Sequence, residues 1–265
     1  MCKESKIRPS GAPTRCPSKL PDADNLKLSC SIGDSVGNGI SSVVFEAKDV
    51  TLSDSKSDVH LPPLVLKVAR RWKSNSLLQE AWAYDEMEPI QGVALARCYG
   101  LFQVDLPRNA EPHPWDAKFY QEGQTEEIGF ACDLTRNEYK RSHPALKEFV
   151  YHPDRLCVLV LERLGDELPS DLDELSREEK KKIIDLYREI AHFSIIDPEQ
   201  VNVHNILRAP TNGLASLPSP TTQKIHNWRL IDFAKATKTS HTEEATYKNY
   251  WPSVAAVLGY KVSIR

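Results

Sequence analysis

The segment Gly37-Asn38-Gly39-Ile40-Ser41-Ser42-Val43-Val44, followed by Leu64-Val65-Leu66-Lys67-Val68-Ala69, decides the fold. Before it, residues 26–32 alternate between apolar and polar as a half-buried strand does, and residues 33–39 are rich in turn-forming residues. Residues 43–47 and 64–69 have the composition of two further strands. Three strands that follow one another along the chain predict an antiparallel meander.

The meander is followed by a predicted helix and two more predicted strands. The helix is expected over residues 76–88, because apolar side chains recur at helical spacing and Pro89 ends the pattern. Strands are expected at residues 94–104 and 156–161. The polar residues 105–154 between them are too many for an ordinary hairpin loop, so we expect a partly disordered insertion.

The remainder of the chain has a mainly helical pattern. Ser176 and Glu179 form a capping box in front of an apolar helix face that reaches residue 194. Short strands are expected at 201–207 and 228–231, and a last helix at 242–258. The sequence therefore predicts an α+β fold, in which residues 1–26 are a flexible tail because they lack any hydrophobic period.

Composition excludes several classes of function. The 265 residues include 34 basic and 37 acidic side chains, a net charge of −3, which does not favour a non-specific nucleic-acid binder. Purely aliphatic runs are far too short for a membrane span, and the first residues lack the apolar core of a secretory signal. The six cysteines form no CxxC pair and are interpreted as reduced thiols. We expect neither a nucleic-acid nor a membrane partner, and a cytoplasmic or nuclear location.

Residues 37–44 fit the pattern G-x-G-x-x-S-x-V between two strands. Glycines let a backbone approach nucleotide phosphates, and the loop N–H groups can then point at anionic oxygens. A glycine-rich hairpin that binds nothing has the same composition, so the pattern alone does not decide. A dinucleotide fold is disfavoured, because this loop joins two antiparallel strands and opens no helix.

Lys67 lies inside an apolar strand, where an ammonium group is costly without a partner or a ligand. It is either an edge-strand lysine whose end reaches water or a cation directed at nucleotide phosphates. Glu80, on the following helix, is the expected ion-pair partner, and Glu86 is the competing one.

Two further polar side chains follow or precede apolar segments near the C-terminal end. Asn205 lies within residues 201–207, and Asp232 directly follows the predicted strand at 228–231. An amide oxygen and a carboxylate at the ends of neighbouring strands suit magnesium, which binds hard oxygen ligands and keeps several waters. The structural alternatives are that Asn205 caps a turn and that Asp232 ends a strand.

The order of these features resembles the protein-kinase-like fold over about residues 28–255. The resemblance implies two lobes: an antiparallel-sheet N-lobe with one helix over residues 27–164 and a short, mainly helical C-lobe over 165–265. It implies ATP and Mg²⁺ as cofactors. It also implies a role for each matching residue: a glycine-rich loop with its following valine (Gly37, Gly39, Ser42, Val44), a phosphate lysine and its helix partner (Lys67, Glu80), an adenine-binding hinge (Glu162, Arg163, Leu164) and two metal ligands (Asn205, Asp232).

The phrases at residues 77–81, 90–92 and 98–102 further resemble a branch of kinase-like proteins that is abundant in fungi. The chain departs from the family at the catalytic loop. The family's catalytic aspartate stands five residues before the metal-binding asparagine, where this chain has Gln200, and Pro198 replaces the usual histidine. A neutral glutamine cannot accept the proton as a carboxylate does. Ala234 replaces the last glycine of D-F-G, and no A-P-E motif follows.

These observations leave three hypotheses. The first is an ATP-dependent phosphotransferase that acts on a hydroxyl of an unknown protein or small molecule, with weak or atypical activity and with Lys67, Glu80 and Gln200 at its catalytic positions. The second is a pseudokinase, which binds nucleotide with little or no catalysis. The third is a scaffold that binds no nucleotide, in which Lys67 and Asp232 are purely structural.

Overall fold

The computed structural model describes residues 5–12, 14, 27–53, 61–71, 73–107, 110, 112, 154–197 and 201–260. They divide into two compact units, each treated separately below. The sheet unit takes its residues from Lys19–Trp82 and Cys98–Arg163. The helical unit takes its residues from Met1–Ser18, Ala83–Arg97 and Leu164–Arg265. Residues 83–97, which the sequence placed in the N-lobe, therefore group with the C-terminal part of the chain.

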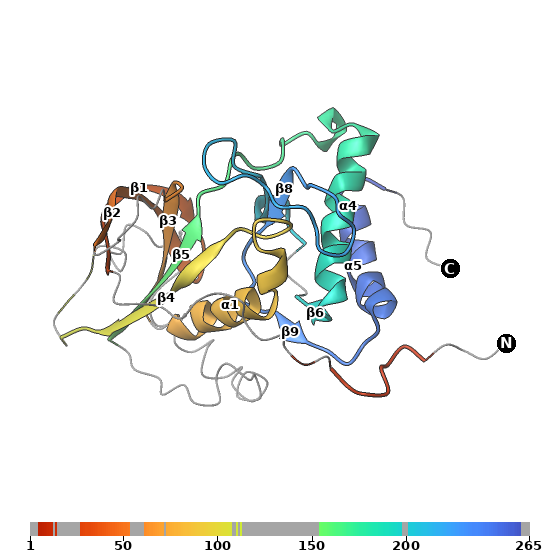
Figure 1. The fold of residues 1–265 in the computed structure, drawn as a ribbon, viewed down its shortest axis with the longest axis horizontal. Coiled ribbons are helices and arrows are strands. Elements are labelled where there is room, and N and C mark those ends of the chain that lie inside the picture. Colours follow the sequence, from red (N-terminus) through yellow and green to blue (C-terminus); the bar gives the residue numbers. More distant parts are fainter. Residues whose placement is uncertain are drawn as a thin grey trace. The chain divides into compact units, whose positions relative to one another are not determined.

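The sheet unit is built on five antiparallel strands in the order β1-β2-β3-β5-β4 (Figure 1). The strands are β1 Lys27–Asn38, β2 Ser42–Ser53, β3 Leu64–Ala69, β4 Cys98–Asp105 and β5 Arg155–Glu162. The predicted meander is therefore confirmed. Together with the helices described below, the sheet confirms the mixed α+β class.

Two boundaries of the sheet differ from the prediction. Residues 33–39 were expected to form a turn, but β1 continues to Asn38, with Gly37 opposite Val44 and Asn38 opposite Val43. Register shifts along β1 absorb the turn-forming residues without ending the strand. Residues 94–97 were expected to begin a strand but belong to the helical unit, where the Leu230 N–H donates to the Ala94 carbonyl at 2.8 Å.

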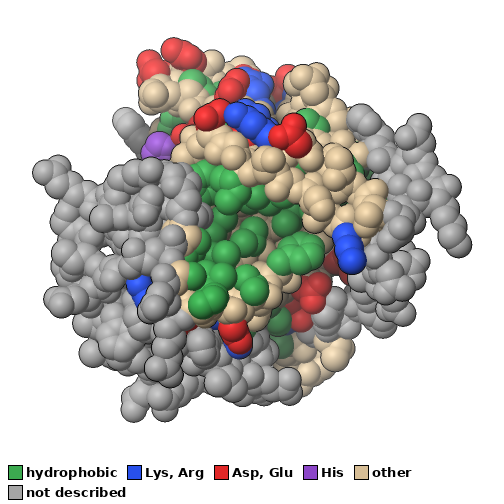
Figure 2. Space-filling view, turned by 90° about the vertical axis from the view of Figure 1, so that its left-hand side faces the viewer, with side chains coloured by type: hydrophobic (Ala, Val, Ile, Leu, Met, Phe, Trp, Pro, Cys, Tyr) green, Lys and Arg blue, Asp and Glu red, His purple; other side chains and the backbone are tan. Residues whose placement is uncertain are grey.

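Strand β3 is buried along its whole length. Successive side chains of a strand point to opposite faces, so Leu64, Leu66 and Val68 share one face. They pack there in a cluster with Val43, Phe45 and Val160. Figure 2 shows hydrophobic side chains gathered on one face of the molecule. The other face of β3 carries Val65, Lys67 and Ala69.

The predicted insertion at 105–154 lies mostly outside the described residues, but its two ends are described. Asp105 and Arg155 are cross-strand partners, and the Arg155 Nε lies 2.7 Å from the Asp105 carboxylate. The Leu106 N–H donates to the Asp154 carbonyl at 2.9 Å. The β4–β5 ladder thus holds the ends of the segment together.

The helical unit contains α4 Arg177–His192 and α5 Glu243–Val257, which pack through the rings of Tyr187 and Tyr250. The predicted capping box is confirmed: Ser176 accepts from the Glu179 N–H, and the Glu179 side chain accepts from the Ser176 N–H. Thr242 caps α5, as the predicted start of this helix requires. None of the helices in the described part of the chain is both long and apolar enough to span a bilayer.

Short elements complete this unit. They are the last residues of α1 Ser74–Glu86, the 3₁₀ turns η1 Glu88–Ile90, η5 Leu172–Glu174 and η6 Val203–Asn205, and the strands β6 Ile195–Ile196, β7 Ile206–Arg208, β8 Trp228–Leu230 and β9 Thr237–Lys238. Strand β6 pairs with β9, and β7 pairs with β8. The strand predicted at 201–207 is thus only partly correct, because residues 203–205 form a turn.

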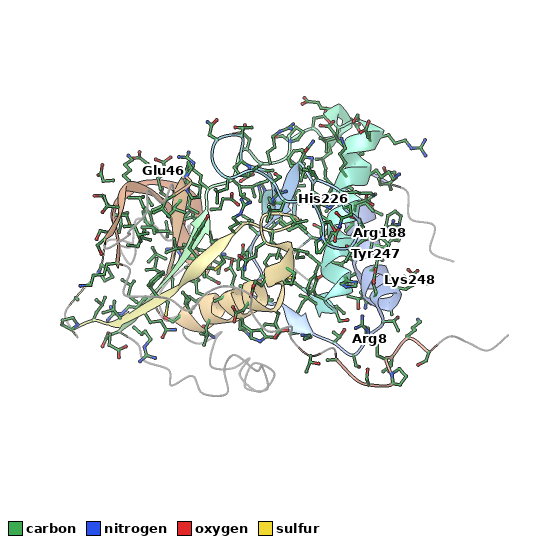
Figure 3. All side chains as sticks on the ribbon, viewed as in Figure 1. Arg8, Glu46, Arg188, His226, Tyr247 and Lys248 are labelled. Carbon is green, nitrogen blue, oxygen red and sulfur yellow. The ribbon has the colours of Figure 1, made fainter. Side chains whose placement is uncertain are left out.

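The N-terminal residues that the structure describes were assigned to a flexible tail, but they pair with the segment in front of α5. Arg8, labelled in Figure 3, donates its N–H to the Ser240 carbonyl at 2.8 Å, and the Thr242 N–H donates to the Lys6 carbonyl at 3.1 Å. Ile7 and His241 form an antiparallel bridge between these bonds. Backbone pairing of this kind needs no hydrophobic period, so the sequence carried no signal for it.

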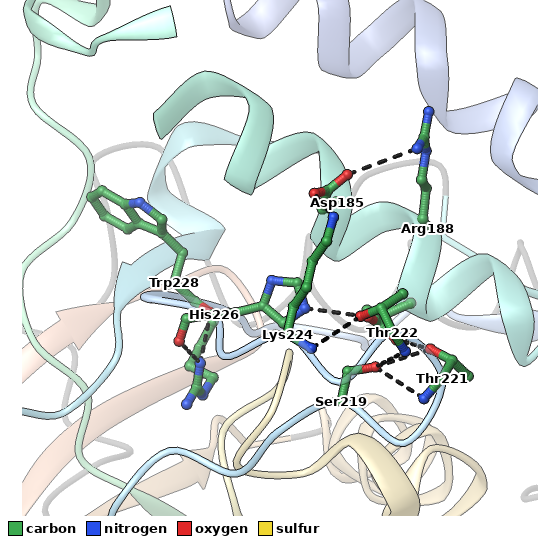
Figure 4. Close-up of polar contacts among 10 residues, drawn as sticks. Asp185, Arg188, Ser219, Thr221, Thr222, Lys224, His226 and Trp228 are labelled. Atoms are coloured by element: carbon green, nitrogen blue, oxygen red, sulfur yellow. Dashed lines mark hydrogen bonds and ion pairs between the residues drawn. The ribbon is translucent and has the colours of Figure 1, made fainter. Parts of the chain in front are cut away.

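A buried carboxylate ties the loop before β8 to α4 (Figure 4). Glu189 of α4 is 2% exposed and accepts hydrogen bonds from the hydroxyls of Thr221 at 2.7 Å and Thr222 at 2.9 Å. The Nε2 of His226 lies 3.2 Å from the Glu189 Oε1, the oxygen to which Thr222 also donates. Burial by itself raises the pKa of Glu189, but the hydrogen bonds from His226, Thr221, Ser219 and Thr222 outweigh it and lower the pKa to about 2.

This network predicts an acid-dependent loss of stability. An unfolded glutamate binds its proton near pH 4.5, whereas the folded Glu189 binds it near pH 2. The free energy of unfolding therefore contains a contribution from Glu189 that is complete above about pH 4.5 and is lost as the pH falls toward 2. We expect Glu189→Gln to flatten the pH dependence of urea unfolding in this window. The exposed Glu174→Gln serves as control, and equal flattening in both variants would contradict the assignment.

Candidate functional site

Lys67 lies in the central strand of the sheet and not at an edge. Its cross-strand neighbours are Val44 on β2 and Leu159 on β5. The residue is only 8% exposed, so its side chain is largely removed from water. The alternative of an edge-strand lysine with a solvated end is therefore wrong.

Glu80 supplies the charge that Lys67 needs. Its carboxylate is fully buried on α1, and its Oε2 lies 2.6 Å from the Lys67 Nζ. Glu86, the competing partner, instead forms an ion pair with Lys238 of β9 in the helical unit. The expected pairing of Lys67 with Glu80 is thus present, and it holds the ammonium group on the face of the sheet that also carries the Val44 side chain.

The glycine-rich segment forms a tight turn between β1 and β2. The Gly39 N–H donates to the Ser42 carbonyl at 2.9 Å, and Ser42 begins β2. Gly37 lies opposite Val44, where an added Cβ would be 3.4 Å from the valine Cβ. Arg70, which sequence reasoning missed, donates to this turn. Its position directly after an apolar strand was the only signal, and it did not reveal an acceptor 31 positions earlier.

The predicted hinge lies where the chain leaves the sheet unit. Glu162 ends β5 opposite Leu64 and is almost completely buried. The Arg163 N–H donates to the Pro63 carbonyl at 2.9 Å, and its side chain forms an ion pair with Glu46, labelled on β2 in Figure 3. Leu164 is the first residue of the helical unit's last segment. The hinge is therefore anchored to the sheet at both Glu162 and Arg163.

The two predicted metal ligands, Asn205 and Asp232, lie at the same end of the antiparallel β7–β8 pair. Asn205 directly precedes β7, and Asp232 follows β8. The Ile231 N–H donates to the Asn205 carbonyl at 3.1 Å, which brings the two segments together. Oxygen ligands in this arrangement suit Mg²⁺, which completes its shell with waters or phosphate oxygens.

Asp232 adopts an unusual backbone conformation. Its φ is +66°, a left-handed value that is uncommon for residues with a side chain and that aspartate adopts more readily than most. The next residue, Phe233, is fully buried and packs edge-on against Tyr84 with ring centroids 5.5 Å apart. The Ala236 N–H donates to the Phe233 carbonyl and closes the following turn.

The position of the missing catalytic aspartate, Gln200, lies outside the described residues. Asp197, a candidate substitute for the base, is described and is only 2% exposed. Its carboxylate accepts from the Lys235 N–H at 3.3 Å, and its own N–H donates to the Tyr250 hydroxyl at 3.0 Å. Asp197 therefore binds the backbone of the segment after Asp232 and is buried.

No protein-family model and no curated protein matches the chain. Within the described ranges, no group of three or more His, Cys, Asp or Glu side chains is placed to hold a metal ion. The functional assignment therefore depends on the chain's own residues.

The Lys67–Glu80 pair predicts a large and asymmetric response to mutation. Removing one partner of a buried pair leaves an uncompensated charge and costs about 3–5 kcal/mol, whereas replacing both with apolar residues is often neutral. We expect Lys67→Met alone to destabilise the protein strongly in urea unfolding. Adding Glu80→Leu should recover most of the loss.

The exposed pair Lys48–Asp34, with Nζ and Oδ2 2.8 Å apart in the same unit, provides the control. Lys48→Met should change stability little, because exposed pairs are screened by solvent. Equal effects of Lys67→Met and Lys48→Met, or no recovery in the double variant, would contradict the assignment of Lys67–Glu80 as a buried, coupled pair.

Proposed function

We propose that this chain is a protein-kinase-like protein with the family's two lobes, similar to the fungal branch, which binds Mg²⁺-ATP and transfers its γ-phosphate to a hydroxyl acceptor with weak or atypical activity. The observation that carries the proposal is the buried Lys67–Glu80 ion pair beside a glycine-rich turn. A lysine ammonium group carries three N–H donors, so its chemistry suits phosphate oxygens as well as a carboxylate.

In this proposal, the sheet unit binds the nucleotide. Gly37, Gly39 and Ser42 surround the phosphates, and Lys67 neutralises them while Glu80 holds it in position. Val44 supplies an apolar contact for the adenine, since it lies directly across the ladder from Lys67. Backbone groups of Glu162 and Leu164 bind the adenine edge, which suits an anchored strand end.

Asn205 and Asp232 of the helical unit would hold the magnesium ion. The proximity of their backbones supports this assignment. Bound Mg²⁺ supplies charge neutralisation on the phosphate oxygens, which is the larger part of catalysis in phosphoryl transfer. The residues of the chain contribute positioning, fixed charge and orientation of the acceptor.

One set of observations favours the pseudokinase as the second candidate. Gln200 cannot accept a proton as a carboxylate does, and Asp197 is buried in hydrogen bonds to other segments. Loss of a general base lowers phosphoryl transfer without preventing nucleotide binding. A scaffold without nucleotide remains the third hypothesis, and ligand binding separates it from the other two.

Thermal melting with ATP, with and without Mg²⁺, tests the proposal directly. A ligand at one hundred times its dissociation constant stabilises the native state by about 2.7 kcal/mol, which raises the Tm of a domain of this size by about 5 °C or more. We expect such a rise for the wild type. Asp232→Asn should abolish its Mg²⁺-dependent part, and the exposed Asp173→Asn should not. No rise at millimolar ATP would favour the scaffold.

Restoring the carboxylate at residue 200 tests whether the remaining machinery is intact. We expect Gln200→Asp to raise phosphate release from ATP by about 10²–10⁴-fold, the usual contribution of general-base catalysis. Gln200→Asn is the matched control, since it has the same shape without the charge. Tight Mg²⁺-ATP binding with no gain in Gln200→Asp would support the pseudokinase.

A further inference from the structure

Arg70 is a buried cation next to the glycine-rich turn. It directly follows β3, three residues after Lys67, and is only 2% exposed. A guanidinium stays charged at any ordinary pH, so its burial is unfavourable unless its donors are used. Its acceptors therefore indicate what this residue does.

Arg70 donates three hydrogen bonds to the turn between β1 and β2. The Nε donates to the Gly39 carbonyl at 3.0 Å, and the Nη2 donates to the Asn38 Oδ1 at 2.5 Å. The backbone N–H donates to the Ser41 carbonyl at 2.9 Å. Arg70 thus donates to Asn38, Gly39 and Ser41, three residues of one short turn.

These bonds fix the orientation of the peptide groups in the turn. In a trans peptide, the carbonyl of one residue and the N–H of the next point in opposite directions. Because the Gly39 carbonyl is directed at the guanidinium, the Ile40 N–H points away from it. Ile40 is 64% exposed, so this donor lies at the open tip of the turn.

We propose that Arg70 is a positioning residue that preforms the turn at residues 38–42 to bind the polyphosphate of a nucleotide. This inference rests on the proposed function, because the ligand is the same. A preformed turn presents its N–H groups without the entropy loss of ordering a flexible loop. The buried positive charge behind the turn adds attraction for an anion.

The ratio of ATP affinity to adenosine affinity tests the proposal. Adenosine lacks the phosphates, so a change in the turn alters ATP binding and leaves adenosine binding unchanged. We expect Arg70→Lys, which keeps the charge but not the forked geometry, to lower the ATP to adenosine ratio by about tenfold or more. Loss of a merely structural contact would lower both affinities equally or neither.

Asn38→Ala provides a second variant that cannot prevent folding through core disruption, because Asn38 is exposed. It removes one acceptor of Arg70, and we expect a smaller decrease in the same ratio. Arg71→Lys is the matched control, because the Arg71 side chain donates to Asp154 at 3.3 Å, at the β5 end of the β4–β5 connection. It should leave the ratio unchanged.

Hydrogen exchange in the ligand-free protein separates this inference from the proposed function. Arg70→Lys should speed exchange of the Gly39 N–H, which donates to Ser42, without affecting the β3–β5 ladder. If Arg70→Lys speeds exchange but the wild type binds no ATP, Arg70 still positions the turn, and the proposal that the turn binds a nucleotide is wrong. ATP binding with an unchanged ratio and unchanged exchange would overturn the role of Arg70.

Discussion

Burial of the Lys67 ammonium group is the constraint on which the sheet unit depends. Strand β3 is covered on both faces, so the charge is largely removed from water and a carboxylate must be brought to it. Glu80 can do this only if α1 packs on the face of the sheet that carries Lys67. The helix must also be rotated so that Glu80 faces the sheet. A single ion pair therefore couples the register of three strands to the rotation of one helix.

The same use of buried charge recurs at segments that hydrophobic packing cannot hold. Arg70 binds the turn between β1 and β2, and Glu189 binds the loop before β8. Asp197 binds the segment after Asp232. In each case the partners are backbone groups, amides or hydroxyls of irregular structure, which offer hydrogen bonds but few apolar atoms. Regular elements carry the core, and charged side chains order the connections between them.

Periodicity explains what the sequence could predict. Strand β3 matches residue for residue, and the capping residues Ser176 and Thr242 mark the starts of α4 and α5, because these signals are local. The predictions failed where backbone pairing with a segment distant in sequence determines the structure. Examples are the continuation of β1 to Asn38 and the pairing of Ile7 with His241. Arg70 was missed for the same reason, whereas Lys67 was found because a lone charge interrupts an apolar strand.

Binding and turnover make different demands on this chain, and its residues meet them unequally. Holding phosphates and a magnesium ion requires fixed charges and oxygen ligands, and Lys67, Glu80, Asn205 and Asp232 are of the required types. Accepting a proton requires a group of suitable pKa at one position, and Gln200 has none. Under the proposed function, the chain thus has residue types for binding but lacks the one for proton transfer. Binding and turnover can therefore be separated by substitution at residue 200 alone.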